Sequence, residues 1–477
     1  MGLVEELSNF AAYIDLDDID PPVKELAKYL ILDSIGCALA AHSIDKGKMA
    51  VAAARGVGGG GASSIIGGSD TVGCLGAVLA NGELIGALDY DALMPGGHVP
   101  GYVIPAPLAL AELKNSSGRD FLLSVIIGFE LTARISGALR FWYCLPDGSF
   151  KWADRQGYAA CNFGAAAAAG RILGLSPGQM INALAVAGHL AQVPTHTRFS
   201  KSANRHMTKY GAPGWQSTGA VTAAVWAEMG FVGDRSLLDD SEHGFWKFVG
   251  FDGWEPDGVL EGIGQSWAFT KVSFKPYPCC RMLHGALDCL VAIRDKNDLH
   301  PQEITKVVAY CHPTVEEPVF RHTELETTVD ATFDFPYLAS VVAHKVPIGV
   351  EWQDGKTMRN PGIRAFREKV TLLPNTSLQS AGETAREKLQ HSCVEVYARG
   401  SVFREESPSP RGSYVDGALR GLTYADLEDK FRHNAERLLT RSQCEKAVQL
   451  LVHLEEVGEI SELMQQISPG TWSPKRK

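Results

Sequence analysis

A lysine, two adjacent cysteines and a histidine lie close together in the segment SFKPYPCCRMLHG, residues 273–285. Cys279, Cys280 and His284 are residue types that bind zinc, but zinc sites usually take cysteines two to four residues apart and need a fourth ligand. The sequence contains no second Cys/His cluster to complete such a site. Burial among its apolar neighbours would lower the pKa of Lys275 and make it a usable base or carboxylate anchor. The pattern favours buried thiols beside this lysine, with a zinc site as the alternative.

Two aspartates and a histidine flank a glycine-rich loop in ALDYDALMPGGHVPGYVIPAP, residues 87–107. Asp89 and Asp91 follow a helical run, and His98 comes just after Pro-Gly-Gly. Loops held by rigid helices often carry catalytic residues. The spacing equally allows a structural interpretation, in which Asp89 caps a helix and His98 makes an ordinary loop hydrogen bond.

Lys209 precedes a glycine-containing turn and an apolar helix in MTKYGAPGWQSTGAVTAAVWAEMGF. Free backbone N–H groups at a helix N-terminus favour anions, so Lys209 could contact an anion held there. The alternative is a solvated loop lysine. The stretch GVGGGG at 56–61 fits G-x-G-x-x-G, but a helix precedes it and a strand follows, the reverse of the order in a dinucleotide site. We interpret it as a turn.

The elements around these residues change type along the chain. Up to about residue 270 the apolar spacing is helical, as in PPVKELAKYLILDSIGCALAA, and the alanines after Gly164 indicate close helix packing. ITKVVAYCH, EKVTLLPN and CVEVYARGSVF are typical of strands, and helical periodicity returns from about 420. We predict a mainly α protein: a large all-α domain of residues 1–270 and 400–477, with a smaller α/β (α+β) lid domain, residues 271–399, inserted.

The composition limits the class of protein. The chain has 477 residues, 45% of them hydrophobic, and a formal net charge of −10, so nucleic acid is not expected as its partner. We expect no membrane association, since no run of about 18 uncharged apolar residues occurs. Ten scattered cysteines suit a reducing compartment, and the N-terminus lacks the pattern of a secretory signal. We therefore predict a cytoplasmic protein.

Motifs spread over nearly the whole chain resemble those of the MmgE/PrpD family, which includes 2-methylcitrate dehydratase, cis-aconitate decarboxylase and iminodisuccinate epimerase. They occur in the family's order: LDSIGCALAA, ANGELIGALDYDAL, HVPGYVIPAPLALAE, FGAAAAAGRILGLS, MTK, FKPYPCC and the terminal LEDKFR…LEEVGEISELMQQI. The resemblance implies a helical domain with an α/β lid, a homodimer, and no metal or organic cofactor.

The resemblance also implies which residues are catalytic. The family's active-site aspartate falls on Asp89, with Asp91 as a competing assignment, and its loop histidine falls on His98. Its two lysines fall on Lys209 and Lys275. This makes Lys275 the functional residue of the first segment and leaves the cysteines to packing.

At three positions where members carry histidine, this chain has Arg155, Ala212 and Cys280. Arginine does not exchange protons near neutral pH but can clamp a carboxylate with two parallel hydrogen bonds. We therefore expect a site shifted toward anion holding. We predict that the following residues contact substrate: Arg155, Asp91, Arg281 and His284.

The predicted activity is that of a cofactor-independent lyase acting on a small di- or tricarboxylate by proton transfer next to a carboxylate. His98 would be the acid/base and Asp89 would orient it, while Lys275, Lys209 and Arg155 would stabilise the developing negative charge. Dehydration of a 2-hydroxy polycarboxylate is the first expectation, and epimerisation, isomerisation or decarboxylation are alternatives. The hypothesis from another class is a non-catalytic carboxylate-binding protein.

Overall fold

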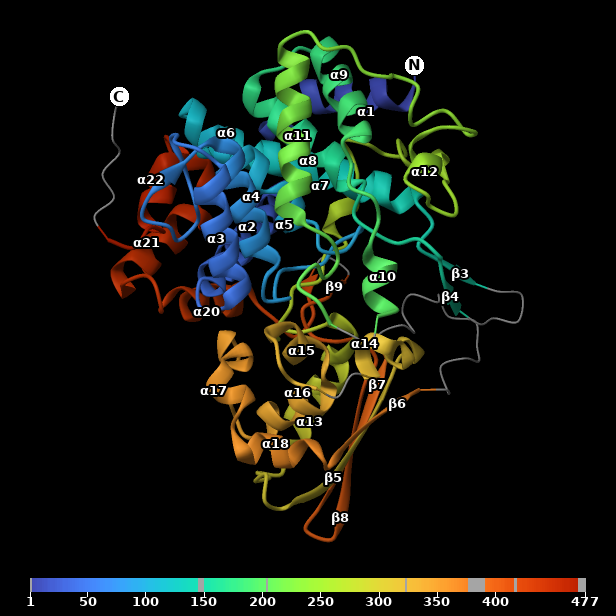
Figure 1. Ribbon diagram of the computed structural model, residues 1–477, viewed down its shortest axis with the longest axis vertical. Coiled ribbons are helices and arrows are strands. Elements are labelled where there is room, and N and C mark those ends of the chain that lie inside the picture. The colour runs from blue at the N-terminus through green and yellow to red at the C-terminus, as the bar shows by residue number, and fades with distance from the viewer. Residues whose placement is uncertain are drawn as a thin grey trace.

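The computed structural model describes residues 2–144, 150–202, 205–321, 324–375, 391–415 and 418–470. Helices dominate it, and a smaller part that carries a β-sheet lies below a larger helical part (Figure 1). The fold is therefore mainly α with some β structure, as the sequence predicts.

The helical part is built from N-terminal and C-terminal helices together. Prolines at the first helical position and Ser/Thr capping boxes begin many of these helices, and Gly174, with φ of 69°, ends α8. The N-terminal helices are α1 (Leu3–Tyr13), α2 (Pro21–Ala41), α3 (Asp45–Val57), α4 (Cys74–Gly86), α5 (Pro100–Val103), α6 (Pro105–Lys114), α7 (Gly118–Ala138), α8 (Cys161–Leu173), α9 (Pro177–His189), α10 (His196–Ser200), α11 (Pro213–Glu228) and α12 (Phe245–Phe248). The C-terminal helices are α20 (Tyr424–Ala435), α21 (Arg441–Val452) and α22 (Ile460–Gln466).

The alanine-rich α8 packs closely against α7, which confirms the expectation from sequence. A Cβ atom on Gly164 would lie 2.1 Å from the carbonyl oxygen of Gly128, so only glycine fits at this crossing. Small side chains at the remaining contacts let the two helix backbones approach.

The term all-α is wrong in detail for residues 1–270 and 400–477. Three short antiparallel pairs occur there: β1 (Ser63–Ser64) with β2 (Thr71–Val72), β3 (Trp142–Cys144) with β4 (Phe150–Trp152), and β9 (Tyr414–Val415) with β10 (Ala418–Leu419). Strands of two or three residues are too short to leave an alternating pattern in the sequence. The turn at 56–61 does lie between helix α3 and strand β1, in the order opposite to a dinucleotide motif.

The smaller part contains a four-stranded sheet in the order β6-β5-β7-β8. Strand β5 (Ile304–Cys311) is parallel to β6 (Val370–Pro374) and antiparallel to β7 (Ser392–Ala398), which pairs with β8 (Ser401–Ser407). These strands confirm the predicted ones. The helices of this part are α13 (His284–Lys296), α14 (Pro318–Arg321), α15 (Thr328–Phe333), α16 (Phe335–Ala343), α17 (Gly355–Met358) and α18 (Pro361–Arg367), and α13 packs on β7 and β8.

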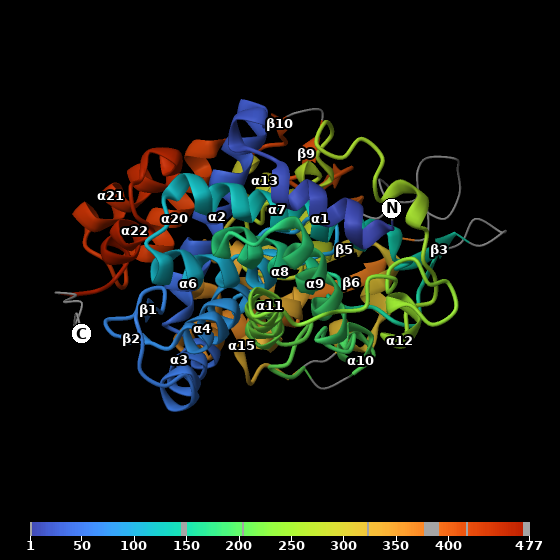
Figure 2. The same ribbon diagram turned by 90° about the horizontal axis from the view of Figure 1, so that it is seen from above.

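Two hydrophobic cores divide the described residues. The first combines buried residues between Val4 and Phe274 with those from Leu427 to Ile467, and the second runs mainly from Tyr277 to Ala398. Both views place α20 to α22 beside α2, with which α20 and α21 are in contact (Figures 1 and 2). Strand β8 (Ser401–Ser407) belongs to the four-stranded sheet, so the sheet continues past the predicted end of the lid at 399, and the boundaries near 270 and 400 stay a prediction.

Helix α7 is the one helix among the described residues that is long and apolar enough to cross a membrane. The protein itself buries 94% of its most apolar window, as expected for a core helix. The cytoplasmic location stays a prediction.

Candidate active site

Asp89 lies three residues beyond the end of α4 in a left-handed backbone conformation, with φ of 55°. Aspartate tolerates this region better than most residues, although it is still unusual. The side chain is fully buried. The turn directs both the carboxylate and the backbone carbonyl of Asp89 at Lys275, whose Nζ lies 2.6 Å from Oδ1 and 2.9 Å from the carbonyl oxygen.

Lys275 is fully buried at the junction of the two cores. Its ammonium group donates to the carboxylate and the carbonyl of Asp89, and these contacts offset the loss of hydration. Lys430 on α20 fixes the backbone of this region by donating to the carbonyls of Tyr90 and Lys275, at 2.8 and 3.0 Å. The C-terminal helices therefore help to position the site.

Lys209 approaches Asp89 from the loop before α11. Its Nζ lies 3.1 Å from Asp89 Oδ1, which makes an ion pair. This contact is not a hydrogen bond, and Nζ has no hydrogen-bond partner among the described residues. The ammonium group also lies 4.6 Å from the centroid of the Tyr210 ring. Burial lowers the pKa of Lys209 to about 8. A buried cation without a hydrogen-bond partner is suited to bind an anionic ligand.

His98 is held between the two aspartates by its two ring nitrogens. Nδ1 is 3.0 Å from Asp91 Oδ2, and Nε2 is 3.2 Å from Asp89 Oδ1. The protonated ring can donate to both carboxylates, whereas the neutral ring can donate to only one. The ring of Tyr210 stacks on the imidazole with centroids 4.7 Å apart. Asp91 therefore makes the hydrogen bond that orients His98, and Asp89 is the centre on which the cations converge.

Neighbouring positive charges keep the two aspartates ionised. Burial alone would raise the pKa of Asp89, but the positive charges of Lys209 and Lys275 outweigh it and hold the pKa well below its usual range. Burial likewise opposes ionisation of Asp91, and His98 outweighs it and lowers its pKa. The cluster thus has two negative charges, of which Asp89 contacts the two lysines and Asp91 contacts His98.

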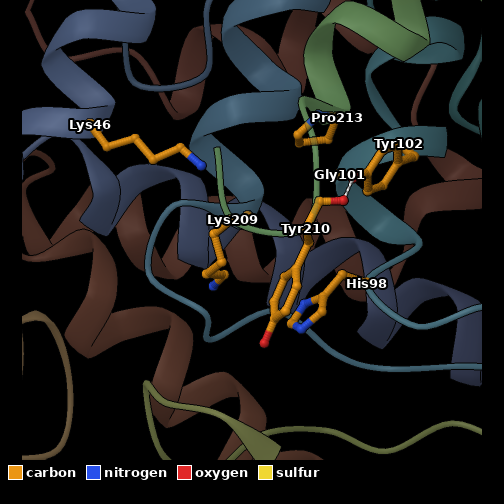
Figure 3. A pocket seen from close by; sticks show the side chains of 8 residues that line it. Lys46, His98, Gly101, Tyr102, Lys209, Tyr210 and Pro213 are labelled. Carbon is orange, nitrogen blue, oxygen red and sulfur yellow. Dashed lines mark hydrogen bonds between the residues drawn. The ribbon is translucent and has the colours of Figure 1, made fainter. Parts of the chain in front are cut away.

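A small cavity opens beside this cluster, with an empty volume of about 280 Å³ that includes space open to solvent. Two lysines and one histidine line it, and none of its lining residues is acidic (Figure 3). The lining residues are Lys46, Gly86, His98, Gly101, Tyr102, Lys209, Tyr210 and Pro213. The cavity is therefore suited to a small anion.

Close helix crossings bring the walls of this cavity together. A Cβ atom on Gly82 of α4 would lie 2.5 Å from the Cα of Gly214 in α11, and one on Gly214 would lie 2.0 Å from the carbonyl of Leu79. Tyr102 on α5 donates to the carbonyl of Tyr210, at 3.1 Å (Figure 3). Tyr210 has φ of 62°, so this bond fixes a strained loop beside Lys209.

The structure brings Asp89, His98, Lys209 and Lys275 together, with Asp91 behind His98, but it does not bring Arg155 to the cavity. Arg155 is exposed, with its side chain near Gly250. The expectation that Arg155 clamps a substrate carboxylate therefore does not fit this structure. Arg155 was selected because it stands nine residues before Gly164. The chain runs along the surface at this point, and the residue type alone does not indicate that.

Arg281 and His284 are buried and bonded to the protein itself. Arg281 donates to the carbonyls of Phe274, Pro410 and Arg411 and to Ser413 Oγ, and one of its nitrogens is 3.3 Å from His284 Nδ1. His284 Nε2 is 3.1 Å from the carbonyl of Cys279. Burial lowers the pKa of His284 well below its usual range. Both residues hold the loop that carries Lys275, so the predicted substrate contact does not fit their placement.

The thiols of Cys279 and Cys280 are buried, and burial raises their pKa, that of Cys280 to about 11. Cys279, Cys280 and His284 do not bring three ligand atoms close enough to share one metal ion, so the geometry does not support the alternative zinc site. Among the described residues, the group of three metal-ligand types close enough to share an ion is Glu351, His433 and Glu436, elsewhere in the molecule.

Sequence reasoning missed four residues at the site. His196 lies half-buried with its ring 4.9 Å from that of Tyr210, and burial lowers its pKa to about 4. Gln353 donates to the carbonyls of Leu88 and Pro278, at 2.6 and 3.2 Å, and so links the Asp89 and Lys275 loops. Lys46 and Tyr210 line the cavity. A tyrosine next to Lys209 was visible in the sequence, but the other three come from distant segments.

Comparison with known proteins agrees with these features. The model of the MmgE/PrpD N-terminal domain matches residues 5–256, and that of the C-terminal domain matches residues 277–455. The chain belongs to the MmgE/PrpD family. The family's C-terminal domain thus includes α20 and α21, although these helices pack on α2 of the N-terminal part.

Several relatives are named as cis-aconitate decarboxylases. The chain is 24% identical to the cis-aconitate decarboxylase-like protein oryM of Aspergillus oryzae, over 98% of this chain and 97% of the relative. It is 30% identical to cis-aconitate decarboxylase of Aspergillus terreus, over 61% of this chain and 59% of the relative. The human cis-aconitate decarboxylase is 27% identical over 81% of this chain and 78% of its own length. The family membership supports an enzyme of the lyase type.

Proposed function

We propose that this protein is a lyase that acts on a small polycarboxylate, with decarboxylation of an unsaturated tricarboxylate of the cis-aconitate type as its reaction. The observation that carries the proposal is a cavity lined by His98 and Lys209, where a buried ammonium without a hydrogen bond among the described residues lies next to an oriented imidazole. The names of the relatives favour decarboxylation over dehydration.

In the proposed reaction one carbon–carbon bond breaks and one carbon–hydrogen bond forms. The bond to the leaving carboxylate breaks, carbon dioxide leaves, and the electron pair stays on the carbon skeleton, where the neighbouring unsaturated carboxylate spreads its charge. Lys209 stabilises that negative charge, because its ammonium group lines the cavity and its donors make no hydrogen bond to the residues that the structure describes. Protonated His98 gives its Nε2 proton to the carbon, and Asp91 holds the ring in place through Nδ1.

The reaction needs no metal or organic cofactor in this scheme. The positive charge comes from lysines and the proton comes from a histidine. Lys275 and Asp89 take no part in bond changes. Their ion pair, and the contacts of Asp89 with His98 and Lys209, keep these four side chains in position.

Dehydration of a 2-hydroxy polycarboxylate is the second candidate. It requires a base that removes a proton next to a carboxylate and an acid that protonates the departing hydroxide. His98 and Lys209, whose pKa is about 8, form a pair of titratable groups on one cavity that could share these tasks. The same pair could return a proton to the opposite face, which would make an epimerase.

Proton NMR of the purified protein in D₂O with a panel of small polycarboxylates tests the proposal. The panel contains cis-aconitate, citrate, 2-methylcitrate, itaconate, malate, tartrate and iminodisuccinate. A vinyl product that carries solvent deuterium, together with carbon dioxide release, supports decarboxylation. Product without carbon dioxide supports dehydration, and loss of an α-proton signal without product supports an epimerase. Ligand-induced thermal stabilisation without any spectral change would support the binding protein and overturn the lyase.

A further inference from the structure

We infer that Lys46 is the anchor for the substrate carboxylate remote from the reacting carbon, and that it makes the site selective for ligands with two or more carboxylates. The inference rests on the proposed function, because it assigns a role within the same cavity. Lys46 lies between α2 and α4 in the chain, far in sequence from the residues that hold Asp89.

Lys46 and His98 lie on opposite sides of the cavity. Figure 3 shows the Lys46 side chain extending from one side, with His98 and Tyr210 on the other and Lys209 between them. A ligand that reaches His98 with one end can therefore present its other end to Lys46. This arrangement matches a molecule with separated carboxylates.

The backbone of Lys46 is fixed by the packing of its neighbour. Lys46 belongs to the first turn of α3, and a Cβ atom on Gly47 would lie 2.0 Å from the carbonyl of Ala41 at the end of α2. The first turn of α3 therefore packs tightly against the end of α2. From this fixed backbone the Lys46 side chain extends to the cavity. A cation held in this way loses less entropy on binding than a free surface lysine.

The ammonium of Lys46 is only loosely held by its ion pair. Its Nζ lies 3.4 Å from Glu83 Oε2, and the two side chains are 11% and 16% exposed. Oε1 of Glu83 accepts from the backbone N–H of Gly214, at 3.3 Å. An ammonium group has three donors, so Lys46 can keep Glu83 at one of them and offer the others to a carboxylate.

The charges of the Asp89 cluster explain why a further cation is needed. Asp89 and Asp91 balance Lys209 and Lys275, so protonated His98 is the single uncompensated positive charge of that cluster. One such charge suits a monocarboxylate. Lys46, which is paired with Glu83, adds ammonium donors at a second point of the cavity wall, and a second cationic contact is what a polycarboxylate requires.

The test compares Lys46→Gln with Lys48→Gln, because Lys48 lies on the same helix and its side chain is 61% exposed. The probes are cis-aconitate and the monocarboxylate crotonate, and the readouts are calorimetric Kd and steady-state kcat and KM. We expect Lys46→Gln to weaken cis-aconitate binding about 10- to 100-fold and raise KM similarly, as for the loss of a hydrogen bond to a charged group. The Kd of crotonate, and the kcat for cis-aconitate, should change by less than about threefold. Lys48→Gln should behave as wild type, and Lys46→Arg should restore most of the affinity.

The outcomes separate this inference from the proposed function. If wild type binds cis-aconitate in a Lys46-dependent way but turns over nothing in the panel, the lyase fails and the anchor stands. If turnover occurs and Lys46→Gln has the wild-type KM and Kd, the anchor is overturned and the lyase stands. A fall in kcat with unchanged KM would also overturn the anchor, as would a wild-type protein that binds no polycarboxylate.

Discussion

At the scale of single residues, the proton on His98 decides the charge of the site. The two aspartates and two lysines cancel, and His98 lies within 3.2 Å of one aspartate and 3.0 Å of the other. Protonation therefore converts a neutral cluster into a cationic one next to the cavity. When His98 gives its proton to the substrate, the site loses one positive charge. The anionic product is then bound less tightly, so proton transfer and product release are coupled.

The pKa of Lys209 predicts a loss of activity at alkaline pH. Burial sets this pKa at about 8, and a deprotonated amine no longer stabilises an anion. We expect kcat/KM to fall about tenfold per pH unit above pH 8. Lys209→Arg should remove this limb of the pH profile, because arginine stays charged. An unchanged alkaline limb in Lys209→Arg would assign it to another group.

Stability should respond to the same group with the opposite sign. The pKa of Lys209 is lowered from 10.5 to about 8 in the folded protein, so the unfolded chain binds more protons between these values. The contribution of Lys209 to the free energy of unfolding therefore rises with pH across this window. Denaturant unfolding of wild type and Lys209→Met at pH 8 and at pH 10 measures this contribution. We expect the free energy of unfolding of wild type to rise relative to that of Lys209→Met from pH 8 to pH 10.

Asp89, His98, Lys209 and Lys275 could be selected from the sequence because the resemblance placed them. Their roles stay a prediction, and the geometry adds that Asp91 is the partner of His98 Nδ1. Arg155 was selected by counting along the chain, and counting does not show that the backbone there runs along the surface. Lys46 and His196 were missed because only tertiary packing of distant segments brings them to the site.

At the scale of elements, α20 secures the loops that carry the site. Lys430 lies 2.6 Å from the fully buried Asp33 of α2 and donates to the carbonyls of Tyr90 and Lys275. Removing the ammonium would leave a buried carboxylate and two carbonyls without this partner. The C-terminal helices are therefore part of the framework of the candidate active site.

We expect Lys430→Met to lower the free energy of unfolding by about 3–5 kcal/mol, the cost of breaking a buried ion pair. The double variant with Asp33→Leu should recover a large part of this loss, because no charge is then buried alone. Lys48→Met, which removes an exposed pair with Asp45, should cost less than about 1 kcal/mol. Equal effects of Lys430→Met and Lys48→Met on urea unfolding would contradict the role given to Lys430.

The long helices and the four strands of the sheet were predictable because periodicity extends over many residues. The segment PPVKELAKYLILDSIGCALAA coincides with α2, Pro21–Ala41. The pairs β1–β2, β3–β4 and β9–β10 were not predictable, since their strands have two or three residues. Their formation depends on turns and tertiary contacts, which have no repeat in the sequence.

At the scale of the whole molecule, exposed apolar side chains gather at the end of α11 and just beyond it. Met229 is 79% exposed, Val232 72%, Phe231 52% and Trp226 39%. Large side chains of this kind in one segment are typical of an interaction surface. The homodimer implied by the family resemblance would use such a surface, and we propose this one.

Sedimentation at micromolar concentration tests the homodimer. We expect wild type to sediment as a dimer and Met229→Lys to shift toward monomer, because a buried lysine at an interface is unpaired. Val57→Lys, at a 77% exposed position on α3, should leave the dimer unchanged. A monomeric wild type would contradict the dimer, and an undisturbed Met229→Lys dimer would place its interface elsewhere.

The most direct test of the central claim, that His98 transfers the proton at this site, compares turnover of cis-aconitate by wild type, His98→Ala and His243→Ala. His243 has a side chain that is 82% exposed and serves as the matched control. The account predicts that His98→Ala loses about 10²- to 10⁴-fold in kcat while still binding cis-aconitate, and that His243→Ala is unaffected. Equal kcat for wild type and His98→Ala would contradict the account.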